Sequence, residues 1–351
     1  MKAVVITAPG RVGIEQIPEP APDSTQLLIQ VEACGICGTD VHILDGDFAP
    51  TRYPIVPGHE FCGEVVAAGS KAQNHRVGDF VAVDPSLFCG RCRYCRAGRF
   101  NLCEFWDGIG VGATNGACAE FVNVPAANAF PLPPGLPRHF GTLVEPLACA
   151  VHGFDRIVAR LGSSYLIYGA GAMGLMLGQL ARHAGASRVD MVDINTARFE
   201  VARRLCADDV ATSADALERG AGWDVVIDAT GAVPAIEDGL RRASRGGTFL
   251  VFGVASAAAT AMFSPFRVYN DELTVLGSMA IVHSFERALS LIDRGVIDCA
   301  ALLTGRLPLE SWGEALELFR RGAGLKTQVT PTLKPAVVAP NQRSSAVRTK
   351  E

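Results

Sequence analysis

Four cysteines lying close together are the residues of this sequence best suited to chemistry. They follow the spacing Cys-x2-Cys-x2-Cys-x7-Cys, at Cys89, Cys92, Cys95 and Cys103. Thiolates at such short spacings can surround one Zn²⁺ as a tetrahedron and leave no position for a substrate. Disulfides or a redox pair are the alternatives, but the glycine turns between the cysteines favour a metal-binding loop. The spacing therefore predicts a closed, structural zinc site.

A second set of possible ligands is spread along the chain. It comprises Cys37, Thr39, Asp40 and His42 in CGICGTDVH, His59 and Glu60 in PGHE, and Glu145 in VEPLACAVHG. One thiolate, one imidazole and one or two carboxylates suit an open zinc site that keeps a position for water or substrate. A lone cysteine or histidine, however, is more often a packing residue. The residues by themselves leave open whether this second site assembles.

A glycine-rich loop, GAGAMG, is the third motif. Its glycines are Gly169, Gly171 and Gly174, and Met173 lies between the last two. The loop directly follows the apolar segment 165–168 and opens a helix-like segment, which is the context that a dinucleotide-binding loop requires. The glycines allow a tight turn, approach of a pyrophosphate to the backbone, and close helix–strand packing. We predict dinucleotide binding here; the alternative is an ordinary turn with incidental glycines.

An acidic residue after the loop bears on the choice of coenzyme. Asp193 lies nineteen residues after Gly174, at the end of the second predicted strand of this region. A carboxylate there can accept hydrogen bonds from the adenosine ribose and repels a 2′-phosphate, which favours NAD over NADP. Arg198 would soften that preference if it turned toward the ribose. For Arg198 we expect a solvent-facing position on the following helix.

The elements that must position these residues change in character near residue 150. Before it, short β-type runs alternate with glycine and proline turns, as in an antiparallel, barrel-like β domain. After it, strands alternate with helical stretches, which is typical of a doubly wound parallel sheet. From about residue 284 to 330, helix-like segments return with short strands. The pattern alone does not show whether this last part rejoins the first domain.

Composition excludes several classes of function. A chain of 351 residues with 49% hydrophobic residues and a net charge of −4 is long and apolar enough for two globular domains. The sequence contains no long basic or acidic run, so its charge gives no reason to expect a nucleic-acid or membrane partner. We expect no signal peptide, because the first residues lack an apolar core and a cleavage site, and no apolar run of about 18 residues predicts a membrane span. Eleven cysteines then suggest a reducing, cytoplasmic location.

Taken together, these motifs resemble those of the zinc-containing medium-chain alcohol dehydrogenases, in the branch of polyol (sorbitol-type) and threonine dehydrogenases. CGICGTDVH, VPGHEFCGEV, the four-cysteine loop, EPLACAVHG and GAGAMG occur in the family's order, from Met1 to about Pro331. The resemblance implies α/β plus β architecture. A GroES-like β catalytic domain at 1–150 and 285–333 would carry a structural zinc lobe at 86–106. A Rossmann coenzyme domain, with a doubly wound parallel sheet, would occupy 151–284, and the polar tail at 334–351 would be disordered.

The same resemblance implies roles for individual residues. Cys37, His59 and Glu60 would bind a catalytic zinc, and Glu145 would be a fourth ligand or would orient the zinc-bound water. Thr39 would contact the substrate oxygen, and His42 would receive the alcohol proton. Gly169, Gly171, Met173, Gly174, Asp193 and Arg198 would hold NAD. The expected cofactors are therefore two Zn²⁺ ions per chain, one of them structural, and NAD.

The implied activity is zinc-dependent, NAD-linked oxidation of a secondary alcohol to the ketone, with hydride passing to nicotinamide C4. Glu145 is typical of polyol and vicinal-diol enzymes, so a polyol, diol or sugar alcohol is the expected substrate. Sorbitol-type enzymes have an arginine shortly after the position of Gly277, where this chain reads Ser-Met-Ala-Ile, which favours a less polar alcohol. Threonine dehydrogenase-like oxidation and a non-catalytic NAD(H)- or zinc-binding protein are the alternatives. Relatives commonly form dimers or tetramers, so we expect a homotetramer or a homodimer.

Overall fold

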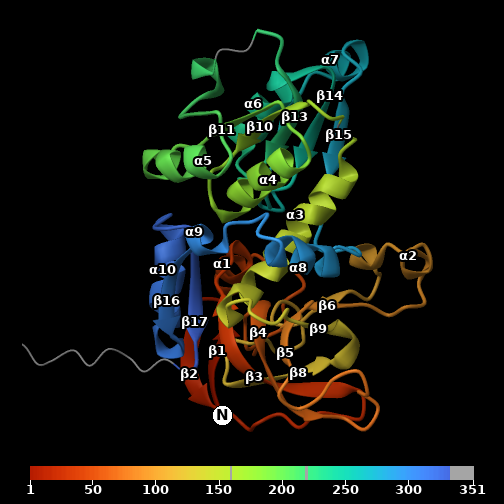
Figure 1. Cartoon of the computed structure of the whole chain (residues 1–351), viewed down its shortest axis with the longest axis vertical. Helices are drawn as coiled ribbons and strands as arrows, with labels where there is room; N and C mark the ends of the chain where they lie inside the picture. The colour runs from red at the N-terminus through yellow and green to blue at the C-terminus, as the bar shows by residue number, and fades with distance from the viewer. Residues whose placement is uncertain (159, 218–219, 333–351) are drawn as a thin grey trace, which may run out of the picture.

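The computed structural model of the chain describes residues 1–158, 160–217 and 220–332, and it has two domains (Figure 1). The upper domain in this view is built on a parallel sheet, and the lower domain is mainly β structure. The two fold classes expected from the sequence are therefore confirmed. The tail predicted at 334–351 lies outside the described residues.

The coenzyme domain contains a six-stranded sheet in the order β12-β11-β10-β13-β14-β15, with every pair parallel. Its strands are β10 (Ser164–Tyr168), β11 (Arg188–Val192), β12 (Asp209–Ala211), β13 (Trp223–Asp228), β14 (Ala243–Val251) and β15 (Thr274–Gly277). The strand order reverses between β10 and β13. Ligands of such sheets bind beyond the carboxyl ends of the strands at this reversal.

Helices of the coenzyme domain pack on both faces of this sheet. They are α4 (Ala172–His183), α5 (Phe199–Leu205), α6 (Val233–Arg242) and α7 (Pro265–Asn270). On one face, Leu175 and Met176 of α4 are fully buried in the main core. On the other face α6 lies so close that a Cβ atom on Gly239 would stand 2.7 Å from the ring of Phe249. Both packing layers hold the carboxyl ends of the strands in fixed positions.

The catalytic domain is built on a seven-stranded sheet. Its strands are β3 (Gln26–Gly35), β4 (Glu60–Ala68), β5 (Phe80–Val83), β8 (Phe121–Pro125), β9 (Ala129–Pro131), β16 (Leu303–Pro308) and β17 (Lys326–Thr330). The pairing is antiparallel, as expected, except between β16 and β17, which are parallel. β17 pairs with β3, with Gln328 opposite Gly35. The last part of the chain therefore rejoins the first domain, which the sequence pattern did not settle.

Helices and a hairpin complete this domain and connect it to the other. They are β1 (Lys2–Ala8), β2 (Arg11–Gln16), α1 (Gly38–Asp45), α3 (Val144–Arg156), α8 (Phe285–Asp293), α9 (Cys299–Leu302) and α10 (Trp312–Arg320). Short 3-10 turns are η1 (Phe100–Leu102), η2 (Ala126–Asn128), η3 (Arg138–Leu143), η4 (Thr196–Arg198), η5 (Ala214–Ala216) and η6 (Leu309–Ser311). Helix α3 runs without a break across the boundary expected at residue 150 and reaches from one domain to the other (Figure 1). The exact division into domains stays a prediction.

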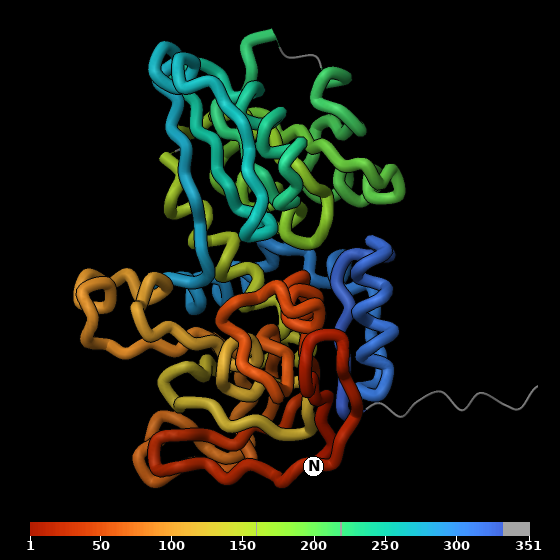
Figure 2. The backbone as a smooth tube through the Cα atoms, turned by 180° about the vertical axis from the view of Figure 1, so that it is seen from behind, coloured from red at the N-terminus to blue at the C-terminus, as the bar shows by residue number. Residues whose placement is uncertain are grey.

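The cysteine-rich segment forms a projection that we call the zinc lobe, residues 86–108. It contains β6 (Ser86–Leu87), α2 (Arg93–Arg96), η1 and β7 (Asp107–Gly108), and the pairing of β6 with β7 closes its base. Figure 2 shows the lobe extending sideways from the catalytic domain, beneath the chain that descends from the coenzyme domain. Within the described part of the chain, no helix is long and apolar enough to cross a membrane.

Candidate active site and two candidate metal centres

Two neighbouring strands bring the predicted zinc ligands together. Cys37 follows the end of β3 and stands at the N-terminus of α1, while His59 and Glu60 lie at the start of β4. Strands β3 and β4 pair so that Gly35 is opposite Glu60. A Cβ atom on Gly35 would stand 2.3 Å from a carboxylate oxygen of Glu60, so glycine is required there. The register of the sheet therefore gathers residues that are distant in sequence.

The ligand atoms of Cys37, His59 and Glu60 all lie within 4.8 Å of one another. His59 and Glu60 are buried, and Cys37 is half-buried, so one side stays accessible. Buried Nδ1 of His59 has no hydrogen-bond partner among the described residues, which is costly unless a ligand binds there. Thiolate, imidazole and carboxylate form the donor set of an open zinc site. These residues fit a catalytic zinc ion.

Asp40 and Glu145 border this group. Asp40 is fully buried in α1, accepts a hydrogen bond from the Cys37 amide at 2.9 Å, and has an oxygen 4.0 Å from His59 Nδ1. Glu145, in the first turn of α3, is not one of the three clustered ligands; its carboxylate accepts a hydrogen bond from the Cys149 thiol at 3.4 Å. Burial raises the pKa of Glu145 to about 7, with His59 opposing this shift and Glu60 adding to it. The charges of the neighbouring ligands therefore affect the Glu145 carboxyl group, although Glu145 is not one of the three clustered ligands.

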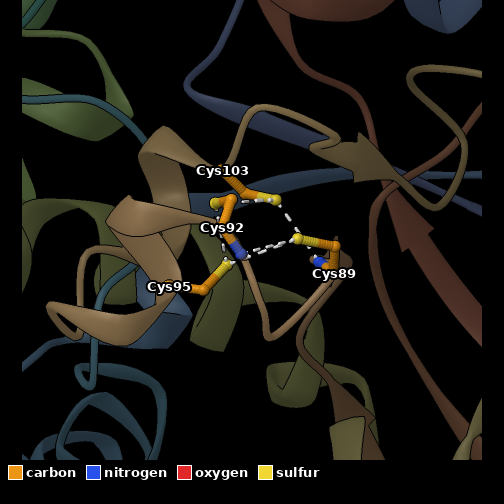
Figure 3. A group of neighbouring side chains, drawn as sticks. All are labelled: Cys89, Cys92, Cys95 and Cys103. Carbon is orange, nitrogen blue, oxygen red and sulfur yellow. Dashed lines mark hydrogen bonds between the residues drawn. The ribbon is translucent and has the colours of Figure 1, made fainter.

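The four cysteines of the zinc lobe point toward a common centre (Figure 3). Their sulfur atoms are 3.5 Å apart for Cys92 and Cys95, and 4.0 Å apart for two further pairs. Four ligands at about 2.3 Å from a zinc ion require sulfur–sulfur distances of about 3.8 Å. None of these cysteines forms a disulfide. Backbone N–H groups, first that of Cys95, lower the pKa of Cys92 to about 6, which favours the thiolate that zinc binds.

The glycine loop lies at the reversal of strand order in the coenzyme sheet. Gly169 directly follows β10 and has a φ of +97°, a left-handed conformation that favours glycine. A Cβ atom on Gly174 would stand 1.7 Å from the Gly169 carbonyl oxygen, so only glycine lets α4 begin this close. Around Gly171 the nearest atom to such a Cβ is 3.6 Å away, on Arg198. That open position is where a pyrophosphate could approach, while Met173 packs against the core.

Asp193 and Arg198 are paired beside this loop. Asp193 is buried and accepts hydrogen bonds from the amides of Ala170 and Asn195, each at 2.7 Å. Arg198 donates to Asp193 at 3.2 Å, and its buried Nε has no partner among the described residues. The expectation of a solvent-facing arginine was therefore wrong, because the carboxylate attracts the guanidinium back over the loop. An arginine beside Gly171 that keeps one unpartnered N–H fits a bound dinucleotide.

Comparison with known proteins agrees with this geometry. Residues 23–134 match the alcohol dehydrogenase GroES-like domain, and residues 172–294 match the zinc-binding dehydrogenase domain. D-arabinitol dehydrogenase 1 of Uromyces fabae is 36% identical over 94% of this chain and 97% of its own. This chain belongs to the zinc-containing medium-chain alcohol dehydrogenase family. It is an oxidoreductase of the polyol and threonine dehydrogenase branch.

Two further relatives of this alcohol dehydrogenase bear on substrate and coenzyme. D-altritol 5-dehydrogenase of Agrobacterium fabrum is 34% identical over 92% of this chain and 96% of its own. A crystal structure of a zinc-binding dehydrogenase from Sinorhizobium meliloti, bound to NADP, has a TM-score of 0.89 and 34% identity. It covers 94% of this chain and 99% of that one. These relatives confirm the predicted family and show that the chain is an enzyme. The alternative of a non-catalytic NAD(H)- or zinc-binding protein is therefore set aside.

The residues expected to move the proton lie next to the candidate zinc ligands of the dehydrogenase. Thr39 and His42 are three positions apart on α1, so their side chains emerge from neighbouring places on the same helix. The Thr39 hydroxyl is 3.7 Å from the Cys37 sulfur. Both residues are half-buried, and their own role stays a prediction.

One residue of the dehydrogenase site was missed by sequence analysis. Lys326, the first residue of β17, is 4% exposed and donates to both carboxylate oxygens of Glu60 at 2.7 Å and to the Ile36 carbonyl at 3.1 Å. Burial disfavours the ammonium ion, but the charges of Glu60 and Cys37 outweigh it and raise the pKa of Lys326. The sequence around Lys326, GLKTQV, contains no recognisable motif. Only the pairing of β17 with β3 places Lys326 beside Glu60.

Proposed function

We propose that this enzyme oxidises a secondary alcohol, specifically a polyol, vicinal diol or sugar alcohol, to the ketone with NAD as the acceptor. The observation that carries the proposal is the partly open cluster of Cys37, His59 and Glu60 in a chain whose second domain presents a glycine loop. Zinc held by this cluster would act as a Lewis acid that makes the alcohol a stronger acid. NAD would supply the hydride acceptor, and the protein supplies position and charge.

In this proposal the chain's own residues position the substrate and remove its proton. Thr39 has a hydroxyl that can accept a hydrogen bond from the alcohol and donate its own proton onward. His42, one turn along α1, is the side chain type that most readily accepts a proton near neutral pH. Asp40 holds the Cys37 backbone through its hydrogen bond and so keeps the thiolate in place. Glu145 serves as a fourth ligand or orients a water molecule from its buried position.

Replacing Thr39 by Ala should lower kcat by about 10²- to 10⁴-fold, because the first group of the proton path is lost. Thr39→Ser keeps the hydroxyl and should retain most activity. Both variants should keep the zinc content of the wild type, since Thr39 is not one of the clustered ligands. Metal analysis with steady-state kinetics checks this, and normal turnover by Thr39→Ala would remove Thr39 from the path.

NAD is the proposed coenzyme because Asp193 presents a buried carboxylate beside the glycine loop. Replacing Asp193 by Ser should lower the ratio of kcat/KM for NAD to that for NADP by at least about tenfold. The repulsion of the 2′-phosphate is lost, while Arg198, now without its carboxylate partner, becomes free to bind that phosphate. Kinetics with both coenzymes measure the ratio, and an unchanged preference would show that Asp193 does not select the coenzyme.

The substrate class rests on the polyol enzymes among the relatives and on Glu145. NADH formation should be measured with D-arabinitol, D-altritol, sorbitol, 2,3-butanediol and threonine, using protein whose zinc content is known. About two zinc ions per chain and activity on the polyols or diols are the expected results. Preference for threonine would support the amino-alcohol alternative, and inactivity toward every alcohol would contradict the proposed function.

We also infer that the enzyme is a homo-oligomer, a tetramer or a dimer, in a reducing compartment such as the cytoplasm. Strand β15 is an edge strand, and it and α7 carry exposed apolar residues: Phe266 is 70%, Tyr269 82% and Val275 48% exposed. Exposed apolar residues at a sheet edge favour association. The eleven cysteines all lie in the described residues and none forms a disulfide, which fits a reducing environment. Light scattering gives the oligomeric state.

A further inference from the structure

The zinc lobe contacts the part of the chain that leaves the coenzyme domain. We call residues 278–284 the crossover segment, because they connect β15 to α8 in the catalytic domain. In Figure 2 this descending chain passes directly beside the lobe, and Figure 1 shows the same neighbourhood near α2 and α8. The contact joins residues about half the chain apart. Closing a zinc site does not require this contact.

Asn101 makes the central contact. Its side chain is buried, with 8% exposure, and its Nδ2 donates a hydrogen bond to the Met279 carbonyl oxygen at 2.7 Å. Asn101 lies two residues before the zinc-site Cys103, so the position of its amide depends on the folded zinc loop. A buried side chain with one defined acceptor is rarely incidental, because losing that acceptor leaves its N–H unpaired. The lobe therefore holds the backbone of the crossover segment at Met279.

Aromatic contacts hold the other end of the segment. The ring of Phe100 meets His283 edge to face, with ring centres 5.1 Å apart, and is itself stacked on Phe88 at 4.3 Å. Edge-to-face and offset-stacked rings attract each other beyond simple burial. Asn101 and Phe100, which are adjacent in η1, thus hold positions 279 and 283 of the crossover segment.

The crossover segment needs such support because its backbone is strained. Ala280 has a φ of +51° and His283 a φ of +50°, in the left-handed region that residues other than glycine rarely adopt. These conformations persist only where the surrounding structure holds them. Each strained residue lies at or next to a residue that the lobe contacts.

The same segment forms a wall at the edge of the sheet where the coenzyme would bind. A cavity of about 650 Å³ is lined by Asn101 and Leu102 of the lobe, by 251–254 at the end of β14, and by 277–279 at the end of β15. Carboxyl ends of parallel strands share one edge, so this wall lies at the same edge as the Gly169 loop. A shift of Met279 would change the shape of that edge.

We propose that Asn101 is a positioning residue through which the zinc lobe holds the crossover segment, and thereby shapes the wall beside bound coenzyme and substrate. The role in catalysis rests on the proposed function, whereas the holding of the segment does not. A zinc ion held by the lobe cysteines would affect the reaction only from a distance, by keeping Asn101 in place. It takes part in no chemical step.

Asn101→Ala in the full-length, zinc-replete enzyme tests the proposal. Hydrogen exchange of the peptide covering 278–284 should become at least about tenfold faster, because a buried hydrogen bond and its support are lost. The KM for alcohol and the Kd for NADH should rise about three- to tenfold, with a smaller change in kcat. Exposed Arg96, in the same lobe, provides the control: Arg96→Ala should change none of these values.

A second variant acts from the other side of the contact. His283→Asn removes the ring while keeping a residue type that tolerates the left-handed conformation, and it leaves the lobe untouched. It should also accelerate exchange in 278–284. Unchanged exchange in a folded Asn101→Ala protein that retains both zinc ions overturns the proposal. If Asn101→Ala loses the lobe zinc, His283→Asn decides: faster exchange supports the proposal and unchanged exchange overturns it. Hydrogen exchange and NADH binding can be measured without turnover. Failure of the present proposal can therefore be distinguished from failure of the proposed function.

Discussion

Replacing Cys37 by Ala should lower the rate of alcohol oxidation on the order of 10³-fold or more while the fold stays intact. The thiolate is one of three clustered ligands, and the zinc ion they would hold contributes several kcal/mol to catalysis. Zinc content should fall to about one ion per chain, because the lobe site does not involve Cys37. Metal analysis and NADH formation measured on the same sample check both statements.

Cys118 offers a matched control for this substitution. It is a fully buried cysteine whose sulfur contacts Cys34 at 3.9 Å and belongs to neither ligand group. Cys118→Ala should keep both zinc ions and most of the activity, with only a modest loss of stability from the lost packing. If Cys37→Ala kept both its zinc content and its activity, the assignment of Cys37 as a catalytic ligand would be wrong.

Replacing Lys326 by Met should destabilise the metal-free protein by about 3–5 kcal/mol. The substitution leaves the Glu60 carboxylate buried without the cation that contacts both of its oxygens. With zinc bound by Cys37, His59 and Glu60, the metal charge would replace the ammonium, so the loss should be clearly smaller. Urea unfolding of wild type and variant, each with and without zinc, measures the two differences.

The pair between Lys2 and Glu310 is the natural comparison, because the same two residue types meet at the surface. Their side chains are 34% and 29% exposed, and Lys2→Met should therefore cost about 0–1 kcal/mol with or without zinc. Equal losses for Lys326→Met in both metal states would mean that zinc does not share Glu60 with Lys326. A loss no larger than that of Lys2→Met would contradict the importance of the buried pair.

Short spacings explain why so much of the site could be predicted from the sequence. Four cysteines within one loop must lie close together whatever the rest of the fold does, and the glycine loop likewise carries its own local geometry. The scattered ligands were different. Only the resemblance to known dehydrogenases indicated that Cys37, His59 and Glu60 meet, because their meeting depends on the register of β3 and β4.

The positions of Lys326 and Arg198 could not be predicted from the sequence. Lys326 is a lysine in a short C-terminal strand, and nothing local distinguishes it from a surface lysine; the pairing of β17 with β3 decides its burial. Arg198 sits at the start of α5, where solvent exposure is the ordinary outcome, but the carboxylate of Asp193 lies within reach. Long-range pairing and local charge determined these positions. Neither leaves a periodic or spaced pattern in the sequence.

The most direct measurement uses a secondary alcohol of the active class that carries deuterium on its carbinol carbon. The zinc-replete enzyme, NAD and this alcohol are incubated, and the NADH formed is analysed by mass spectrometry. Direct hydride transfer to the nicotinamide predicts that the deuterium is retained in NADH and that the product is the deuterium-free ketone. Oxidation without deuterium in NADH, or no oxidation of any alcohol by protein holding both zinc ions, would contradict the account.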